Sequence, residues 1–278
     1  MSASPREGHA GFRSVTFPLP SDPLASFRLD DRLIVVTGAS EGIGRAFAEC
    51  FARAGALVVL ASRRKDKLEL VRQAIAASGG RAEVVPADVS RLDDIRNLAD
   101  TVGRLAKESD RRLVLVNNAG FGFTRAVLEI SEEDWDRLFD THVRGTFFCS
   151  QKIGAMMIER GYGKIVNLSS AWAQATDAGK SAYGAAKAAV SHLTAQLSAE
   201  WAPLGVRVNA LAPTATLTEF TAGVMAANPD RAKRLLDRIK LGRFAQAQDL
   251  LGAGVFLASA ASDFVTGQTL FVDGGFTT

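Results

Sequence analysis

Cysteine is scarce in this sequence: its 278 residues include only Cys50 and Cys149. Two cysteines cannot build the disulfide framework of a small secreted protein, and they favour a reducing compartment. The first residues also lack the apolar core of a secretory signal peptide. We therefore expect a cytoplasmic protein.

Long apolar runs, blocks of like charge and metal-ligand spacings are missing too. No uncharged stretch approaches the roughly 18 apolar residues of a membrane helix, so we expect no membrane partner. The 33 Lys and Arg residues nearly balance 30 Asp and Glu residues, and no basic run is present, so we expect no nucleic-acid partner. The His, Cys and acidic residues show no spacing typical of metal ligands, and we expect no catalytic metal.

A globular composition is present, with 47% hydrophobic and 23% charged residues. Residues 1–28 hold four of the eight prolines and are expected to form an irregular N-terminal arm. From residue 29 to 278, short β-branched runs alternate with amphipathic stretches of helical length, without a break in composition. This pattern predicts one α/β domain, a Rossmann-like doubly wound parallel sheet with helices on both faces. The expected strands are 33–36, 56–60, 82–86, 113–117, 164–168, 206–211 and 269–272.

A glycine-rich segment, TGASEGIG over 37–44, joins the first expected strand to a helix. Missing side chains let a backbone approach a pyrophosphate, and a helix N-terminus offers free N–H groups to it. An ordinary glycine-rich turn would look the same locally. The segment also matches the nucleophile elbow of α/β-hydrolases, with Ser40 as nucleophile. That hydrolase hypothesis needs a downstream acid and histidine, and His142 and His192 both fall in predicted helices.

The second expected strand leads into Ser62 and Arg63, and Ser62 lies 24 residues beyond Gly38. A carboxylate near this position would bind the ribose of NAD, whereas an arginine accommodates the 2′-phosphate of NADP. We therefore expect NADP(H) to be favoured over NAD(H). Two observations weigh against this: Arg63 and Arg64 could be solvated charges at a helix start, and Glu41 would repel a nearby phosphate.

Tyr183 and Lys187 are four residues apart in a predicted helix and therefore share a face. An ammonium beside a phenol favours the phenolate, so the pKa of Tyr183 should fall from its usual value of about 10 toward neutral pH. Such a tyrosine can act as general acid and base at an alcohol oxygen. Ser170 ends the preceding strand, and the segment 117–120 ends the strand before it, at the sheet edge where ligands bind.

Together these residues resemble the short-chain dehydrogenase/reductase family over about residues 30–275. The supporting motifs are TGASEGIG, Asp88-Val89, NNAG over 117–120, the set Ser170, Tyr183 and Lys187, and TGQTLFVDGG over 266–275. The resemblance implies an NAD(P)-dependent oxidoreductase that interconverts a ketone and a secondary alcohol. By position, Tyr183 would exchange the proton, Lys187 would lower its pKa and hold the nicotinamide ribose, and Ser170 would bind the reacting oxygen.

The resemblance also implies a cofactor site. Asp88 would contact the adenine, Asn117 the adenosine ribose region, and Thr218 the nicotinamide amide. The full implied set is Gly38, Ser40, Gly42, Ile43, Gly44, Ser62, Arg63, Asp88, Val89, Asn117, Ala119, Gly120, Tyr183, Lys187, Pro213, Thr216 and Thr218.

Two residues depart from the family pattern. His142 stands where the family usually has Asn, whose main-chain carbonyl is thought to hold a water in a proton relay. His142 is either a member of such a relay or a buried core histidine, and the helix distortion that Asn favours becomes doubtful. Thr214 follows Pro213 where the family usually has Gly, which should alter the loop.

Residues 214–235 are long for a connection, and the resemblance implies a mobile lid there. The aromatic and apolar residues near the site suggest a small, apolar ketone or alcohol as substrate; they are Phe121, Phe123, Trp172, Phe220 and Met225. The resemblance further implies a homotetramer or homodimer. The alternative function is a non-catalytic, nucleotide-binding regulatory protein that keeps the fold.

Overall fold

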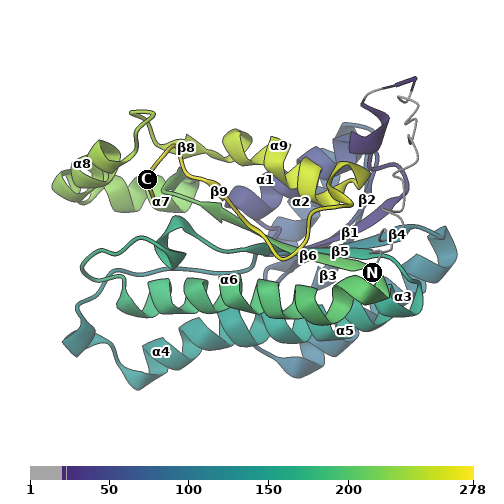
Figure 1. Cartoon of the computed structure of the whole chain (residues 1–278), viewed down its shortest axis with the longest axis horizontal. Coiled ribbons are helices and arrows are strands. Elements are labelled where there is room, and N and C mark those ends of the chain that lie inside the picture. The colour runs from purple at the N-terminus through teal and green to yellow at the C-terminus, as the bar shows by residue number, and fades with distance from the viewer. Residues whose placement is uncertain (1–20, 23) are drawn as a thin grey trace, which may run out of the picture.

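The computed structural model describes residues 21, 22 and 24–278, and a seven-stranded parallel sheet lies at its centre (Figure 1). Its strands are β1 (Arg32–Thr37), β2 (Leu57–Ser62), β3 (Arg81–Pro86), β4 (Arg112–Asn117), β5 (Gly163–Leu168), β6 (Val206–Pro213) and β9 (Thr269–Val272). These are the seven strands predicted from the sequence, and the α/β fold class is confirmed.

Helices alternate with these strands along the chain. They are α1 (Gly42–Arg53), α2 (Lys65–Ala77), α3 (Leu92–Ser109), α4 (Glu132–Phe139), α5 (Gly145–Glu159), α6 (Ser181–Trp201), α7 (Glu219–Ala226), α8 (Pro229–Arg238) and α9 (Ala247–Ala258). None of the helices within the described part of the chain is long and apolar enough to cross a bilayer.

The strand order is β3-β2-β1-β4-β5-β6-β9. The chain builds outward from β1 to one edge, then crosses to β4 on the other side of β1 and builds toward the opposite edge. Neighbouring connections therefore leave the sheet in opposite directions at β1 and β4, which opens a crevice at their carboxyl ends. Thr37 and Asn117 end these two strands and so stand at the crevice.

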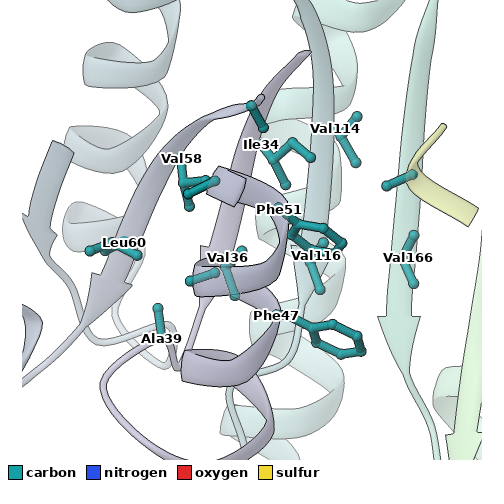
Figure 2. Packing of buried hydrophobic residues seen from close by; sticks show 14 of the residues in the cluster. Ile34, Val36, Ala39, Phe47, Phe51, Val58, Leu60, Val114, Val116 and Val166 are labelled. Carbon is teal, nitrogen blue, oxygen red and sulfur yellow. The ribbon is translucent and has the colours of Figure 1, made fainter. Parts of the chain in front are cut away.

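Both faces of the sheet are buried, because the central strands carry apolar side chains at successive positions. Ile34, Val36 and Val116 face helix α1, whose stacked Phe47 and Phe51 rings lie 5.4 Å apart between centroids (Figure 2). The alternate residues, such as Val35 and Leu115, face the opposite core, formed with α3, α5 and α6. The two cores explain why the strands read as continuous apolar runs.

The N-terminal arm expected over 1–28 lies mostly outside the described residues. Its described end forms a short 3₁₀ turn, η1 (Ala25–Phe27), and the Phe27 ring lies 6.4 Å from that of Phe256 on α9. Leu29, just beyond it, is fully buried in the core. The segment expected to form a lid contains β7 (Thr216–Leu217), α7 and most of α8, and β7 pairs with β8 (Ala245–Gln246).

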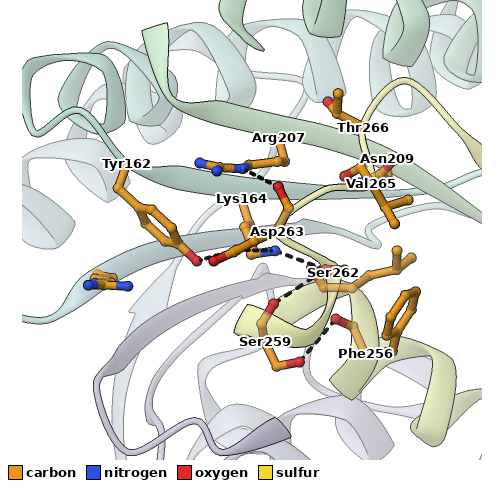
Figure 3. A network of polar contacts seen from close by, with 12 residues as sticks. Tyr162, Lys164, Arg207, Asn209, Phe256, Ser259, Ser262, Asp263, Val265 and Thr266 are labelled. Atoms are coloured by element: carbon orange, nitrogen blue, oxygen red, sulfur yellow. Dashed lines mark hydrogen bonds and ion pairs between the residues drawn. The ribbon is translucent and has the colours of Figure 1, made fainter. Parts of the chain in front are cut away.

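A polar network closes the amino-terminal edge of the sheet, opposite the crevice (Figure 3). The fully buried Lys164 ammonium on β5 lies 2.9 Å from the Asp263 carboxylate and donates to Ser262 Oγ at 2.8 Å. The Tyr162 hydroxyl also donates to Asp263, and Arg207 of β6 donates to its main-chain oxygen. Asp263 therefore ties two central strands to the segment that follows α9.

Candidate active site

The glycine-rich segment forms the turn between β1 and α1, as the sequence predicts. Gly38 has φ of +67° and Gly42 has φ of +56°, conformations that side-chain-bearing residues rarely adopt. No side chain caps the N-terminus of α1, so its first N–H groups stay available to an anion. A Cβ at Gly44 would lie 2.3 Å from the Gly38 carbonyl oxygen and 2.3 Å from Asn118 Nδ2. Only glycine allows this close packing.

Asn118 holds the turn against the end of β4. Its Nδ2 donates to the carbonyl oxygens of Thr37 at 2.9 Å and Gly38 at 3.3 Å. In return, Thr37 Oγ1 accepts the backbone N–H groups of Asn118 and Ala119, both at 3.0 Å. The two motifs TGASEGIG and NNAG thus form one hydrogen-bonded unit, and sequence analysis missed the part played by Asn118 and Thr37.

The end of β2 carries the residues expected at the adenosine ribose. Ser62 Oγ is buried and has no hydrogen-bond partner among the described residues. Arg64, rather than Arg63, reaches the loop: its guanidinium lies 3.3 Å from Ser40 Oγ and 2.7 Å from the Glu41 carboxylate. Hydrogen bonds and charge from Arg64 and Lys67 lower the pKa of Glu41 against a smaller opposing effect of burial. The repulsion expected from Glu41 is therefore partly compensated.

Two residues of the implied cofactor set are buried, and a third, Asp88, is half-buried. Asn117 is 5% exposed, and its Nδ2 donates to Ser150 Oγ at 3.0 Å and Asn167 Oδ1 at 2.9 Å, so its side chain cross-links the core instead of facing the adenosine region. Val89 is buried against Gly145 of α5. Asp88 uses Oδ1 to accept from Ser90.

Ser170, Tyr183 and Lys187 come together beyond the carboxyl end of β5. Ser170 is 4% exposed and lies just past the strand, while Tyr183 and Lys187 occupy successive turns of α6. The Lys187 ammonium lies 5.8 Å from the Tyr183 ring centroid and donates to the Leu168 carbonyl oxygen at 2.5 Å. Ser170 Oγ donates only weakly, at 3.4 Å, to the Pro213 carbonyl oxygen. Its proton can therefore be redirected to another acceptor.

The expected fall in the pKa of Tyr183 is wrong for this structure. Burial raises the pKa of the phenol, and the hydrogen bond with Ser170 only partly offsets that rise. Burial also lowers the pKa of Lys187 to about 7. Lys187 directs its ammonium to the Leu168 carbonyl oxygen, and no hydrogen bond among the described residues joins it to the phenol. The phenol is therefore arranged to keep its proton until an acceptor arrives.

His142 lies in a π-helical turn, η3 (Asp140–Arg144), between α4 and α5, so the helix is distorted although Asn is absent. His142 is 3% exposed, and its ring stands edge-on to the Tyr183 ring with the two centroids 5.6 Å apart. A Cβ added at Gly120 would lie only 2.3 Å from the His142 ring, so the ring packs directly on this glycine. Its Nε2 lies 2.6 Å from the Phe121 carbonyl oxygen. Burial and the charge of Lys187 lower the pKa of His142 to about 3, against the opposing hydrogen bond with Phe121.

Nε2 also lies 3.1 Å from the Phe121 backbone N–H, so it can accept from that group or donate to the Phe121 carbonyl oxygen. Only the tautomer that donates from Nε2 leaves Nδ1 as an acceptor. Nδ1 is buried and has no partner among the described residues. His192, by contrast, is exposed and interacts with Gln196. Neither of these histidines contacts Ser40, which counts against the hydrolase hypothesis.

The lid segment closes on the glycine-rich turn. Thr218 caps α7 through its hydroxyl, and its methyl group lies 3.4 Å from the position of a Cβ at Gly42. Thr216 is 5% exposed and donates to the Thr214 carbonyl oxygen at 3.0 Å. Among the described non-glycine residues only Asp110 has positive φ. Thr214 therefore fits the loop without backbone strain, and the alteration expected there is not seen in its φ.

The aromatic residues expected around the substrate divide into two groups. Phe121 and Phe123 belong to the same cluster as Tyr183, whereas Trp172 packs with Leu235 and Phe276. Met225 is half-buried in the lid. The side chain of Phe220 lies outside the described part of the structure.

Residues 38–277 match the profile of the family described as enoyl-(acyl carrier protein) reductase. The chain belongs to the short-chain dehydrogenase/reductase family. Gluconate 5-dehydrogenase of Gluconobacter oxydans (strain 621H) is 38% identical over 251 residues, which cover 90% of this chain and 96% of that relative. The likeness spans the whole domain, and this short-chain dehydrogenase/reductase is an NAD(P)-dependent oxidoreductase acting on alcohols and ketones.

Two solved structures show how widely the fold is used. A gluconate 5-dehydrogenase of Burkholderia cenocepacia J2315, in complex with NADP and tartrate, is 35% identical with a TM-score of 0.86, covering 92% of this chain and 99% of that one. A 7α-hydroxysteroid dehydrogenase complexed with NADH and 7-oxo glycochenodeoxycholic acid is 32% identical with a TM-score of 0.84, covering 90% and 96%. The relatives give no support to the non-catalytic alternative.

The crevice of this short-chain dehydrogenase/reductase fits a dinucleotide on two observations. The N-terminus of α1 lacks a side-chain cap, and the Ser62 hydroxyl is buried without a partner among the described residues. Each is a feature that a bound diphosphate or ribose would satisfy. The residues present are therefore compatible with NAD(P).

Proposed function

We propose that this chain is an NADP(H)-favouring carbonyl reductase or alcohol dehydrogenase in which Tyr183 is the general acid and base. The observation that carries the proposal is the placement of the buried phenol between a hydroxyl and an amine at the crevice edge. Ser170 supplies the hydroxyl and Lys187 the amine. The bound cofactor supplies or accepts the hydride.

In the reducing direction, Tyr183 gives its proton to the carbonyl oxygen of the substrate. The raised pKa of Tyr183 keeps the phenol protonated until then. Ser170 donates its weakly held proton to the same oxygen and so stabilises the negative charge that develops there. Lys187, with a pKa of about 7, returns a proton toward the tyrosinate and exchanges it with solvent near neutral pH.

His142 takes a positioning role in this proposal. In the tautomer that donates from Nε2 to the Phe121 carbonyl oxygen, the neutral ring keeps the buried Nδ1 as an acceptor, and the charge of Lys187 helps to lower the pKa of the ring. An acceptor there can hold a proton-carrying water, the part that the resemblance gives to a main-chain carbonyl. His142 is thus both a buried packing residue over Gly120 and a candidate relay member.

NADP(H) is the cofactor that we favour, because β2 ends on Ser62 and Arg63 without a carboxylate there, and the nearby Arg64 and Lys67 both pair with Glu41 of the glycine-rich turn. Arg63 is exposed and near Ser62, and Arg64 already spans Ser40 and Glu41. The 2′-phosphate would enter this cationic group and share Arg64 with Glu41. Among the solved relatives, the Burkholderia cenocepacia structure contains NADP and the 7α-hydroxysteroid dehydrogenase contains NADH, so both cofactors occur in similar proteins.

Purified full-length chain, supplied with NADPH or NADH in parallel and a panel of ketones and alcohols, tests the proposal. We expect turnover with NADPH to exceed turnover with NADH at equal concentration on the same ketone. Absence of turnover with either cofactor, in a folded protein that binds NADPH, would instead support the non-catalytic alternative.

The substrate is a small molecule that packs against Phe121 and Phe123. An aromatic wall accepts the carbon–hydrogen face of a polyol as well as an apolar ring, so the apolar substrate suggested by the sequence stays a prediction. A polyol or sugar acid is equally compatible with this wall, and gluconate 5-dehydrogenases are among the relatives.

We also propose a homo-oligomer, dimer or tetramer. Large apolar side chains are exposed on α4 and α5, such as Trp135 and Phe147, and β9 presents Leu270 at an open sheet edge. Analytical ultracentrifugation should find a species of two or four chains. The cytoplasmic location and the absence of a catalytic metal stay predictions.

A further inference from the structure

A half-buried ammonium stands beside the reacting phenol. Lys180 precedes α6, and its Nζ lies 5.4 Å from the ring centroid of Tyr183. Nζ donates to the Phe123 carbonyl oxygen at 3.2 Å. The backbone is fixed on both sides, because Lys180 N donates to Asp177 O and Gly184 N donates to Lys180 O at 2.7 Å. The ammonium is therefore held between the Tyr183 ring and the Phe123 carbonyl oxygen.

This ammonium lacks a counter-ion in the part of the chain that the structure describes. Burial and the charge of Arg231 lower the pKa of Lys180 to about 8, and Asp177 opposes them more weakly. Asp177 Oδ1 is occupied with its own turn, accepting the N–H of Ala178 at 2.9 Å. Other cations of this region do have a carboxylate partner: Arg125 pairs with Asp134, and Lys233 pairs with Asp237 at 2.7 Å.

Helix α8 carries a second cation, Arg231, on a face that packs toward the segment before α6. Arg231, Leu235 and Arg238 recur at i, i+4 and i+7 and so share one face. Leu235 is buried in a cluster with Trp172, and Arg238 donates to the Thr176 carbonyl oxygen at 3.1 Å. This face thus packs on residues 171–176, which precede Lys180. The positive charge of Arg231 contributes to the lowered pKa of Lys180.

We propose that Lys180 and Arg231 bind an anionic group of the substrate, so that the substrate class is a hydroxy acid and its keto acid. Two like charges that are partly withdrawn from water repel each other, and a carboxylate relieves this while accepting charge-assisted hydrogen bonds from both. The 5.4 Å between the ammonium and the phenol ring restricts the substrate to a few bonds between the reacting carbon and the anionic group. Phe121 and Phe123 cover the chain between them.

This inference rests on the proposed function, and paired substrates separate the two. The probes are keto acids and matched neutral ketones, each reduced with NADPH: acetoacetate against methyl acetoacetate, levulinate against methyl levulinate, and 5-keto-D-gluconate against L-sorbose. We expect wild-type kcat/KM to be at least tenfold higher on the acid in the pair that is reduced best. Reduction of neutral ketones only would overturn the inference and leave the proposed function standing, whereas reduction of none would refute the proposed function.

The variants are Lys180→Met, Lys180→Arg and Arg231→Gln, with Lys233→Met on the exposed face of α8 as control. Lys180→Met should lose at least tenfold in kcat/KM on keto acids, mainly through KM, and less than threefold on neutral ketones. Lys180→Arg should recover most of that loss, and Lys233→Met should change neither. Equal losses on both substrates in Lys180→Met would show that Lys180 only supports the Phe123 carbonyl. Arg231→Gln, which keeps the Lys180–Phe123 contact, decides the matter if Lys180→Met does not fold.

Discussion

Replacing Gly44 by alanine should separate the cofactor-binding turn from the rest of the fold. Gly44 has ordinary helical φ, so alanine meets no backbone strain there and gains up to about 1 kcal/mol of helix propensity. Its Cβ, however, would lie 2.3 Å from both Gly38 O and Asn118 Nδ2, where ordinary contact begins at 3.4 Å. The glycine-rich turn must therefore move by about 1 Å away from α1.

A displacement of that size in a positioning element can cost on the order of a hundredfold in function. We expect Gly44→Ala to weaken NADPH binding by at least tenfold, which corresponds to about 1.4 kcal/mol. Isothermal titration calorimetry with NADPH measures this directly, and thermal unfolding reports stability in the same sample.

Gly252→Ala is the matched control. Gly252 also lies within a helix, α9, and an added Cβ there meets nothing within 4 Å. This variant should bind NADPH as the wild type does and should gain up to about 1 kcal/mol of stability, or roughly 2–4 °C in Tm for a domain of this size. Unchanged NADPH affinity in Gly44→Ala would refute the claim that this turn holds the cofactor.

Three further predictions follow from named contacts. Burial lowers the pKa of His142 from 6.5 to about 3, so between these pH values the unfolded state binds a proton that the folded state does not. The free energy of unfolding should therefore fall by roughly 1.4 kcal/mol per pH unit as the pH drops from 6.5 toward 3. In urea titrations, His142→Asn should remove this pH dependence, and His192→Asn should keep it. Asp263→Ala should lower the free energy of unfolding by about 2–3 kcal/mol, because the buried Lys164 ammonium then keeps only Ser262 as a partner. Asp237→Ala, which removes the exposed pair with Lys233, should lower it by about 0.5 kcal/mol or less. Equal losses in chemical unfolding would contradict the role given to the network. In fluorescence titrations, Arg63→Asp and Arg64→Asp should each weaken the binding of NADPH at least tenfold and the binding of NADH less than threefold. Arg96→Asp on α3 is the control and should change neither affinity. Equal weakening of the two cofactors would argue against a 2′-phosphate site.

The sheet could be predicted because its strands leave little ambiguity. Runs such as 33–36 and 113–117 are apolar on both faces, and only a parallel sheet covered on both sides buries such runs. The glycine-rich turn was predictable for a related reason, since glycines between a strand and a helix have few other uses. Ser170, Tyr183 and Lys187 came together because strand ends and helix starts meet at one edge of the sheet.

Contacts between distant side chains could not be predicted in the same way. Sequence spacing favoured Arg63, but the helical start of α2 turns Arg64 toward Ser40 and Glu41. The pKa of Tyr183 depends on burial, which spacing does not report. Lys180 has no motif of its own, and its place beside the phenol emerges only when the loop before α6 closes over Phe123.

The central claim is that the Tyr183 phenol transfers the proton while other residues hold the dinucleotide. Tyr183→Phe keeps the ring and its contact with His142 but removes the hydroxyl. Measured together, NADPH affinity should change by less than threefold, and turnover of the best ketone should fall by at least about a hundredfold, the usual contribution of general acid catalysis. A Phe variant that turns over within tenfold of the wild type would contradict the account.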